Sequence, residues 1–325
     1  KLKTDRRCII LNRIINKASN LNGTITVPGD KSISHRSIML GALSKGTTHI
    51  SGFLTGEDCL STVSCFRKMG IDIEINDTNV TVNGKGLYGL SKPNETLYVG
   101  NSGTTLRLMT GILSAQNFSC DITGDESIQK RPMDRVSIPL SLMGADISGT
   151  DKNGKLCAPL HINGSKLNAI EYKLPVASAQ VKSAILLAAM YAKGETTVIE
   201  PEPTRDHTEI MLNYLGANIK HDGNRITCTP VQELYAHDIT VPADISSAAY
   251  FITAGLICPD SVITIKNVGV NPTRTGITDI YLKMGADITF SNEMSVCGEA
   301  TSDITVRYSK LKGTVIGGDI IPRLI

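Results

Sequence analysis

A short phrase recurs four times in this chain of 325 residues, as RKMGIDIEI, SLMGADISG, NYLGANIKH and LKMGADITF. Its glycines are Gly70, Gly144, Gly216 and Gly285, which follow one another at intervals of 74, 72 and 69 residues. Self-similarity at a nearly constant period indicates repeated structural units that pack on their neighbours. The chain is also too long for one small core, and its length suits two domains of roughly 100–200 residues each.

Each phrase marks the end of a helix and the beginning of a strand. Within GITDIYLKMG, the residues Ile277, Ile280, Tyr281 and Met284 fall at positions i, i+3, i+4 and i+7, which is one face of an amphipathic helix. The glycine that follows supplies the left-handed residue that commonly ends a helix. The next stretch, as in residues 71–75, alternates apolar and polar side chains and predicts a strand with one buried face.

A second, more apolar helix recurs as KSISHRSIMLGAL, NSGTTLRLMTGIL, SAQVKSAILLAAM and DISSAAYFITAGL. Residues 184–192 are almost all apolar, and a helix that is apolar all round belongs in the interior of a protein. Buried helices and half-solvated strands predict an inside-out α/β fold, with helices at the centre and sheets outside. The final stretch, GDIIPRLI, resembles the opening of a fifth buried helix, so we expect a C-terminally truncated chain whose last unit is incomplete.

Charge, aromatic content and cysteine spacing limit the class of protein. Lys and Arg number 33 against 31 Asp and Glu, so the net charge of +2 creates no basic field that attracts nucleic acid or anionic lipid. Aromatic residues make up 4% with no Trp, which leaves few stacking platforms for single-stranded nucleic acid. The 8 cysteines form no CxxC pair, and the sequence contains no apolar run of the ~18 residues of a membrane span. The first 20 residues have charges but no adequate apolar stretch or small-residue cleavage site, so we expect no secretory leader in them. We therefore expect a cytoplasmic protein with reduced thiols that contacts neither nucleic acid nor membrane.

The starts of the four buried helices carry small, hydroxylated or amide residues. A helix N-terminus presents unpaired N–H groups and about half a positive charge, so such residues can cradle a phosphate or a carboxylate there. The alternative is that the serines are only N-caps. These helix starts are Lys31 and Ser32; Asn101, Ser102, Gly103 and Thr104; Ser178, Ala179 and Gln180; and Asp244, Ile245, Ser246 and Ser247.

Basic residues accompany these helix starts and favour an anion site over simple capping. They are Lys31, Arg36, Arg107 and Lys182 near the helix starts, and Lys130, Arg131, Arg205 and His207 on loops or helix ends. An arginine that precedes proline, as Arg131 does, is held extended, which suits a fixed fork aimed at an anion. Direct chemistry by His35 is the weaker interpretation, because a histidine on a helix more often packs or is solvated.

Motifs for metals and nucleotides are absent from the sequence. It contains no HExxH, no CxxC pair, no Asp-rich loop, no Walker A motif and no GxGxxG after a strand. We therefore expect a site without metal or organic cofactor that is suited to two small, strongly anionic ligands.

Five stretches, PGDKSISHR, GNSGTTLR, GDESIQKRPM, VASAQVKSAILLA and EPTRDHTE, resemble in order and spacing the 5-enolpyruvylshikimate-3-phosphate synthases, or 3-phosphoshikimate 1-carboxyvinyltransferases. The resemblance runs from about residue 20 to Ile325. It implies an enzyme of aromatic amino-acid biosynthesis that joins phosphoenolpyruvate to the 5-hydroxyl of shikimate 3-phosphate and releases phosphate, with no cofactor. It also implies two domains of three repeated units each, with both ligands in the cleft between them, and we further expect a monomer.

The resemblance assigns roles to residues of these stretches. Lys31, Ser32 and Arg36 resemble residues that hold shikimate 3-phosphate, as do Ser178, Ala179 and Arg205. Lys31 would also reach phosphoenolpyruvate and act as the catalytic proton donor. Gly103 and Arg131 resemble phosphoenolpyruvate contacts, Gln180 a contact to both ligands, and Asn101, Thr104 and Arg107 residues that shape the phosphoenolpyruvate side. Gly103 is the small residue beside which glyphosate fits in sensitive members, so we expect the full-length protein to be a glyphosate target.

The same resemblance limits what this chain is expected to do alone. The catalytic Asp and Glu of the family would lie beyond Ile325, so turnover by this chain alone is doubtful. We expect a first domain at residues 22–237, and a second, incomplete domain formed by residues 1–21 and 238–325. Two alternatives are a UDP-N-acetylglucosamine 1-carboxyvinyltransferase, which shares fold and donor but characteristically has Lys-Asn in place of Lys31-Ser32, and a non-catalytic fragment that binds a phosphorylated ligand.

Overall fold

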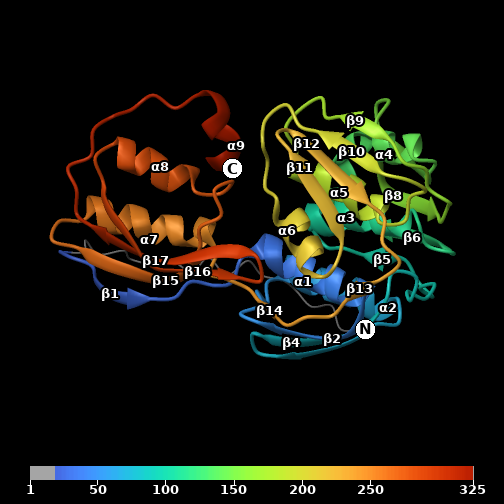
Figure 1. Ribbon diagram of the computed structural model, residues 1–325, viewed down its shortest axis with the longest axis horizontal. Helices are drawn as coiled ribbons and strands as arrows, with labels where there is room; N and C mark the ends of the chain where they lie inside the picture. Colours follow the sequence, from blue (N-terminus) through green and yellow to red (C-terminus); the bar gives the residue numbers. More distant parts are fainter. Residues whose placement is uncertain (1–18, 325) are drawn as a thin grey trace, which may run out of the picture.

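The computed structural model describes residues 19–324, which form two lobes (Figure 1). The part of the second domain that was predicted at residues 1–18 lies outside the described residues. No helix in the described part is long and apolar enough to cross a membrane. The cysteines of this part are free thiols, and most are buried.

The larger lobe is built from three repeated units. The first contains α1 (Lys31–Leu43), β2 (Ser44–Ser51), α2 (Glu57–Lys68), β3 (Asp72–Asn76) and β4 (Asn79–Lys85). The second contains β5 (Leu97–Tyr98), α3 (Gly103–Leu113), β6 (Ser119–Thr123), η1 (Ile128–Lys130), α4 (Asp134–Leu142), β7 (Asp146–Asp151) and β8 (Leu156–Asn163). The third contains β9 (Glu171–Lys173), α5 (Ala179–Ala189), β10 (Thr196–Ile199), α6 (His207–Tyr214), β11 (Asn218–Asp222) and β12 (Arg225–Thr229). Two short strands, β13 (Leu234–Tyr235) and β14 (Ile239–Thr240), follow.

The smaller lobe holds a fourth unit of the same design. It contains β1 (Asn22–Ile25), α7 (Ile245–Ile257), β15 (Val262–Gly269), α8 (Gly276–Lys283), β16 (Asp287–Val296) and β17 (Glu299–Arg307). The short helices η2 (Gly318–Ile320) and α9 (Ile321–Leu324) end the described chain.

One strand order recurs in all four sheets, which confirms the repeat. The orders are β13-β2-β4-β3, β5-β6-β8-β7, β9-β10-β12-β11 and β1-β15-β17-β16. In each sheet the first pair of strands is parallel and the other pairs are antiparallel. The glycine of each recurring phrase has φ between 84° and 97°, so each is the predicted left-handed residue between helix and strand.

The core of the larger lobe confirms the inside-out arrangement for three helices. Beyond their first turns, nearly all residues of α1, α3 and α5 are buried, and the sheets lie around them (Figure 1). Helices α3 and α5 pack so closely that a Cβ on Gly111 would lie 2.2 Å from the carbonyl oxygen of Ala184. A glycine is therefore required at this crossing.

Helix α7 departs from the prediction that the fourth apolar helix is buried all round. Ile252 and Leu256 are fully buried against the sheet, but Tyr250 is 79% exposed and Ile257 is 61% exposed. The periodicity showed an apolar helix but not how many sheets cover it. In the described residues the core around α7 is formed with the single sheet of the smaller lobe.

The strand pairings move both predicted domain boundaries. Strand β1 pairs in parallel with β15, and Val27 packs in the core of the smaller lobe, so the boundary predicted at residue 22 lies several residues later. Strand β14 pairs with β2, so the boundary predicted at residue 238 also lies later. We propose that the first domain comprises residues 29–242, and that residues 19–28 and 243–324 belong to the second.

Candidate active site

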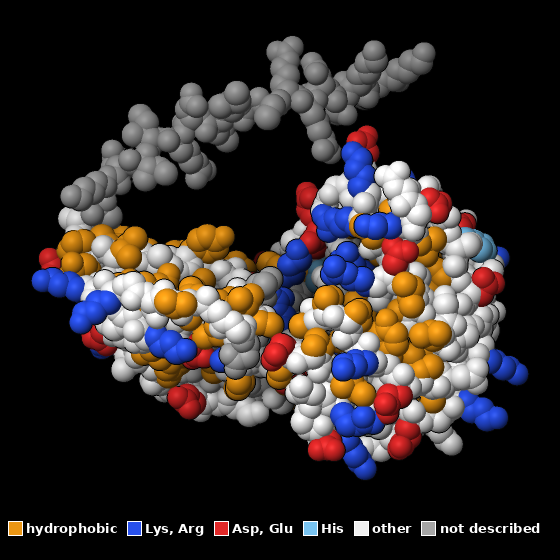
Figure 2. Space-filling model, turned by 90° about the horizontal axis from the view of Figure 1, so that it is seen from above, with side chains coloured by type: hydrophobic (Ala, Val, Ile, Leu, Met, Phe, Trp, Pro, Cys, Tyr) orange, Lys and Arg blue, Asp and Glu red, His pale blue; other side chains and the backbone are white. Residues whose placement is uncertain are grey.

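The starts of α1, α3 and α5 lie together on the side of the larger lobe that faces the smaller lobe. Figure 2 shows Lys and Arg side chains gathered on this side of the larger lobe. A pocket of about 260 Å³ is lined by Ser178, Gln180 and Arg205 from the larger lobe and by Pro322 of α9. Residues predicted from two separate sequence stretches are therefore close neighbours.

The N-cap interpretation is correct for Ser102 and Ser178 but not for Ser32, because Asp30 caps α1. Ser102 accepts a hydrogen bond from the Thr105 N–H at 3.2 Å, and Asp30 accepts one from the Ile33 N–H at 2.9 Å. The Ser178 side chain caps α5 in the same way. A cap satisfies only part of the four N–H groups that a helix start leaves without an intrahelical partner. Capping and anion binding can therefore coexist at these helices.

Two arginines flank the predicted phosphoenolpyruvate contact Gly103. A Cβ on Gly103 would lie 3.1 Å from Nη1 of Arg131 and 3.2 Å from Nη1 of Arg107. Burial, together with the nearby positive charges of Arg131 and Arg135, lowers the pKa of Arg107. Two like charges thus lie beside a backbone that has no side chain, and a bound anion would relieve their repulsion.

Neutral amides hold these two arginines in place. Arg107 donates to Oε1 of Gln180 at 2.5 Å, and Gln180 donates to Oγ1 of Thr104 at 3.0 Å. Arg131 donates to Oδ1 of Asn101 at 2.6 Å. An amide oxygen orients a guanidinium without neutralising it, so the positive charge stays available for a ligand. The predicted members of this side of the site are therefore found together.

Lys31 extends from the start of α1 and pairs with the carboxylate of Asp58 on α2. The two side chains are 49% and 28% exposed, so the pair is open to solvent. Sequence reasoning missed Asp58, because an acidic residue in the first turn of a helix is ordinary. The remaining member of this helix start, Ser32, has its hydroxyl 3.5 Å from Nη1 of Arg205. Burial and the nearby Arg274 lower the pKa of Arg205 to about 10, so Arg205 is still a cation at neutral pH.

Arg36 lies beneath Ser32 and is only 4% exposed. Its guanidinium donates to the Ser32 carbonyl at 2.9 Å, to Thr208 Oγ1 at 2.6 Å and to Ser183 Oγ at 2.9 Å. These contacts fix the first turn of α1 and place a positive charge under it. Direct contact between Arg36 and a ligand remains a prediction.

Lys182 does not belong to the anion site, which corrects the grouping made from the sequence. It is 1% exposed and pairs with Glu200 at 2.8 Å and Glu209 at 2.7 Å. Burial alone would lower the pKa of Lys182, but the two carboxylates outweigh burial and raise it. Lys182 also donates to the carbonyl of Thr204 at 3.3 Å, so it holds the loop that carries Arg205.

His35 is fully buried and hydrogen-bonds to Thr62 through Nδ1 at 2.7 Å. Thr62 contacts the Thr105 hydroxyl at 2.7 Å, and Thr105 donates to Ser102, also at 2.7 Å. His35 therefore belongs to a chain of hydroxyls that ends at the N-cap of α3, and it does not face the pocket.

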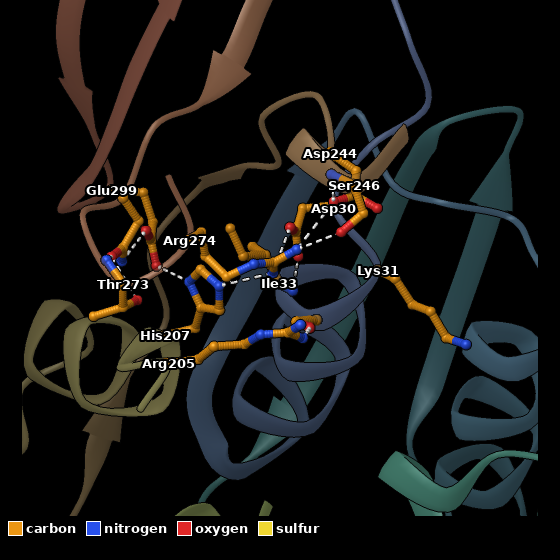
Figure 3. A network of polar contacts seen from close by, with 12 residues as sticks. Asp30, Lys31, Ile33, Arg205, His207, Asp244, Ser246, Thr273, Arg274 and Glu299 are labelled. Atoms are coloured by element: carbon orange, nitrogen blue, oxygen red, sulfur yellow. Dashed lines mark hydrogen bonds and ion pairs between the residues drawn. The ribbon is translucent and has the colours of Figure 1, made fainter. Parts of the chain in front are cut away.

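A polar network joins the two lobes beside the start of α1 (Figure 3). Arg274 from the smaller lobe contacts Asp30 at 3.3 Å and Asp244 at 3.4 Å, and His207 pairs with Glu299 at 2.7 Å. Figure 3 shows that Lys31 points away from this network. Neither Arg274 nor Glu299 was singled out from the sequence. In the described part of the chain, no group of His, Cys, Asp and Glu side chains has the arrangement of a metal site.

Four units share one design, and the helix starts of three of them present Lys, Arg and amide groups on the side that faces the smaller lobe. These features define a class of repeat proteins with a cationic site for small anions. The chain belongs to the EPSP synthase (3-phosphoshikimate 1-carboxyvinyltransferase) family, whose sequence profile matches residues 15–321. This match places the chain with the acceptor shikimate 3-phosphate rather than with the UDP-N-acetylglucosamine alternative. The reaction of the family transfers the enolpyruvyl group of phosphoenolpyruvate to the 5-hydroxyl of shikimate 3-phosphate and releases phosphate, a step of aromatic amino-acid biosynthesis.

Individual relatives show the same similarity. The 3-phosphoshikimate 1-carboxyvinyltransferase of Thermoanaerobacter sp. (strain X514) is 54% identical over 311 residues, which is 96% of this chain and 73% of that protein. The enzyme of the same name from Shouchella clausii is 52% identical over 314 residues, again 96% of this chain and 73% of that protein. Among solved structures, EPSP synthase from Acinetobacter baumannii matches with a TM-score of 0.87 and 50% identity, over 94% of this chain and 68% of that one. The fold class predicted from the sequence is thereby confirmed.

Proposed function

We propose that shikimate 3-phosphate and phosphoenolpyruvate bind side by side across the starts of α1, α3 and α5. Shikimate 3-phosphate contacts Ser32, Arg205 and the first turn of α5, and phosphoenolpyruvate contacts Gly103, Arg107 and Arg131. Gln180 lies between the two sets, since it touches Arg107 and Thr104 and also lines the pocket that contains Arg205. The observation that carries the proposal is this convergence of separate sequence stretches on one cationic surface.

The chemistry explains why fixed positive charges are needed. Two strongly anionic substrates repel each other, so the site must offset their charge and hold their reacting atoms together. A proton then adds to the methylene of phosphoenolpyruvate, C2 becomes electrophilic, and the 5-hydroxyl of shikimate 3-phosphate attacks it. Loss of phosphate, and of a proton from the new methyl group, restores the vinyl group.

Lys31 is the proton donor that we propose. Its ammonium group is open to solvent and pairs with Asp58, so a proton acceptor lies directly beside the donor. A general acid must reach the atom that it protonates, and Lys31 extends from the same helix start as Ser32. This arrangement would place the ammonium beside both substrates.

Calorimetric titration of the chain with each substrate tests this assignment. Removal of one charge-assisted hydrogen bond costs roughly 1.5–3 kcal/mol, which corresponds to about 10- to 100-fold in affinity. We expect Arg205→Gln to lower the affinity for shikimate 3-phosphate by this factor and Arg131→Gln to lower the affinity for phosphoenolpyruvate by the same factor. The matched control is Arg225→Gln, because Arg225 is an exposed arginine of the same lobe that pairs with Glu171.

Titration with UDP-N-acetylglucosamine serves as the negative control for the ligand. Equal weakening by Arg225→Gln and Arg205→Gln would refute the assignment, because a general loss of positive charge would then explain both. Saturable binding of UDP-N-acetylglucosamine would also refute it.

A further inference from the structure

Arg274 is a buried cation at the junction between the lobes. It comes from the loop between β15 and α8 and is 6% exposed. Its guanidinium contacts the carboxylates of Asp30 at 3.3 Å and Asp244 at 3.4 Å, and it donates to Ser246 Oγ at 2.7 Å. Nη1 also lies 3.5 Å from Nε2 of His207. One side chain of the smaller lobe therefore reaches two segments of the larger lobe.

The two carboxylates that Arg274 joins cap the central helices of the two lobes. Asp30 caps α1, and Asp244 caps α7 by accepting from the Ser246 N–H at 3.0 Å. The chain crosses between the lobes at these two places. The crossings pair with each other, since the Asp30 N–H donates to the Pro242 carbonyl at 2.8 Å and the Asp244 N–H donates to the Pro28 carbonyl at 2.9 Å.

The loop that carries Arg274 is itself held firmly against both lobes. Asn271 donates to Asp206 at 2.7 Å and to Glu299 at 3.1 Å, and the Arg274 N–H donates to the Asn271 carbonyl at 2.8 Å. The position of the guanidinium is thus fixed from its own backbone as well as by the carboxylates that it contacts.

Arg274 is the cation that the carboxylates of both crossings share. His207 and Arg274 outweigh the effect of burial and hold the pKa of Asp30 below its usual value. Burial and the nearby charge of Asp30 raise the pKa of Asp244. Without Arg274, Asp30 and Asp244 would lose the one cation that contacts both of them, and removal of one partner from a buried ion pair is strongly destabilising.

The contacts of Arg274 lead directly to the proposed binding residues. Asp30 immediately precedes Lys31 and Ser32, and His207 lies two residues after Arg205. Figure 3 shows Asp30, Lys31, Arg205 and His207 arranged around the same helix start, with Arg274 among them.

We propose that Arg274 is a positioning residue for shikimate 3-phosphate. Arg274 ties the first turn of α1 and the Arg205 loop to the smaller lobe without touching the ligand. The affinity of the larger lobe for the acceptor thus depends on a side chain of the smaller lobe. This inference rests on the proposed function, because it concerns the acceptor side of the same site.

The test combines calorimetry with amide hydrogen exchange at the two crossings. We expect Arg274→Gln to raise the exchange rates of the Asp30 and Asp244 amides by about tenfold or more. The same substitution should lower the affinity for shikimate 3-phosphate by about tenfold, which is within the usual range of coupling between contacting residues. Arg274→Lys should restore little, because an ammonium group is a point charge and cannot bridge two carboxylates as a planar fork does. Arg307→Gln, on an exposed arginine of the same lobe, is the matched control.

Asp30→Asn provides a variant that keeps the cap, since Asn caps a helix about as well as Asp. It removes the charge that faces Arg274 and His207, so it should also weaken binding of shikimate 3-phosphate. The double variant with Arg274→Gln should bind shikimate 3-phosphate no more weakly than Arg274→Gln alone. Faster exchange with unchanged affinity, or additive effects in the double variant, would overturn the positioning role. Failure of the unaltered chain to bind shikimate 3-phosphate would instead refute the proposed function, while the exchange rates would still decide whether Arg274 joins the crossings.

Discussion

Acidification should destabilise this protein through His35. The side chain is fully buried, and burial, followed by the nearby charges of Lys31 and Arg36, lowers the pKa of His35 from 6.5 to about 3. The unfolded chain therefore binds a proton between these two values that the folded chain does not bind. Stability that is present above the unfolded pKa of 6.5 is lost as the pH falls toward about 3.

The size of the effect follows from the two pKa values. Each unit of pKa shift corresponds to about 1.4 kcal/mol, and a fall from pH 7 to pH 5 covers about a unit and a half below the unfolded value. We therefore expect His35 alone to lower the free energy of unfolding by about 2 kcal/mol over this range. That is a large fraction of the ~5–15 kcal/mol that typically separates folded from unfolded domains.

Urea unfolding followed by far-ultraviolet circular dichroism at pH 7 and pH 5 measures this loss. The comparison is with His35→Asn, which does not titrate in this range and keeps a polar atom near Thr62 for the contact that Nδ1 makes. All other histidines are common to both proteins, so their contributions cancel in the difference. If the variant and the unaltered chain lose the same free energy between the two pH values, His35 is not the group responsible and the argument fails.

Three further substitutions test the packing and charge of the site. Gly103→Ala places a Cβ 3.1 Å from Arg131 and 3.2 Å from Arg107, so calorimetry should show phosphoenolpyruvate binding about tenfold more weakly, while the free energy of unfolding in urea changes by less than about 1 kcal/mol. Lys182→Met leaves two buried carboxylates without their cation, and the free energy of unfolding should fall by about 3–5 kcal/mol; a loss below ~1 kcal/mol would contradict the pairing. Gly111→Ala forces a Cβ to within 2.2 Å of a backbone oxygen of α5, so thermal unfolding should show a loss of at least about 1–3 kcal/mol, and an unchanged melting temperature would show that the two helices can separate.

The fold could be predicted from periodicity, because the residue pattern within each unit predicts the helices and strands of that unit. The 3.6-residue pattern before Gly285 predicted α8, and the alternation after Gly70 predicted β3. Both glycines adopt the positive φ that a helix end requires. The exposure of α7 was beyond this reasoning, because an apolar sequence reveals that a helix has faces to cover but not which neighbours cover them.

The error over Lys182 has a geometric cause. Residues two apart on a helix project to different sides, so Lys182 and Gln180 do not share a face although they share a first turn. Gly103 and Arg107 are four apart and do share a face, and the structure brings them together at the site. Grouping by helix start was therefore too coarse. Spacing separates Lys182 from Gln180 but not from Ser178, which lies four residues before it, so only the burial of Lys182 between two carboxylates excludes it from the site.

Arg274 stands at a position that the repeat marks, because the phrase PTR occurs at residues 203–205 and again at 272–274, with each arginine eleven residues before Gly216 or Gly285. The role of Arg274 at the junction was nevertheless not predicted, because it answers a problem that the repeat creates. The two crossings read VPGD, at residues 27–30, and VPAD, at residues 241–244, and each ends in an acidic N-cap. The first crossing requires glycine, since a Cβ on Gly29 would lie 1.9 Å from the carbonyl oxygen of Gly52. When two similar segments pair at one junction, their identical caps bring two negative charges face to face. A cation must then come from elsewhere in the chain, and the loop after β15 supplies it. The residue that joins the two lobes is therefore the counterpart of Arg205 in the next unit, although its contacts differ from those of Arg205.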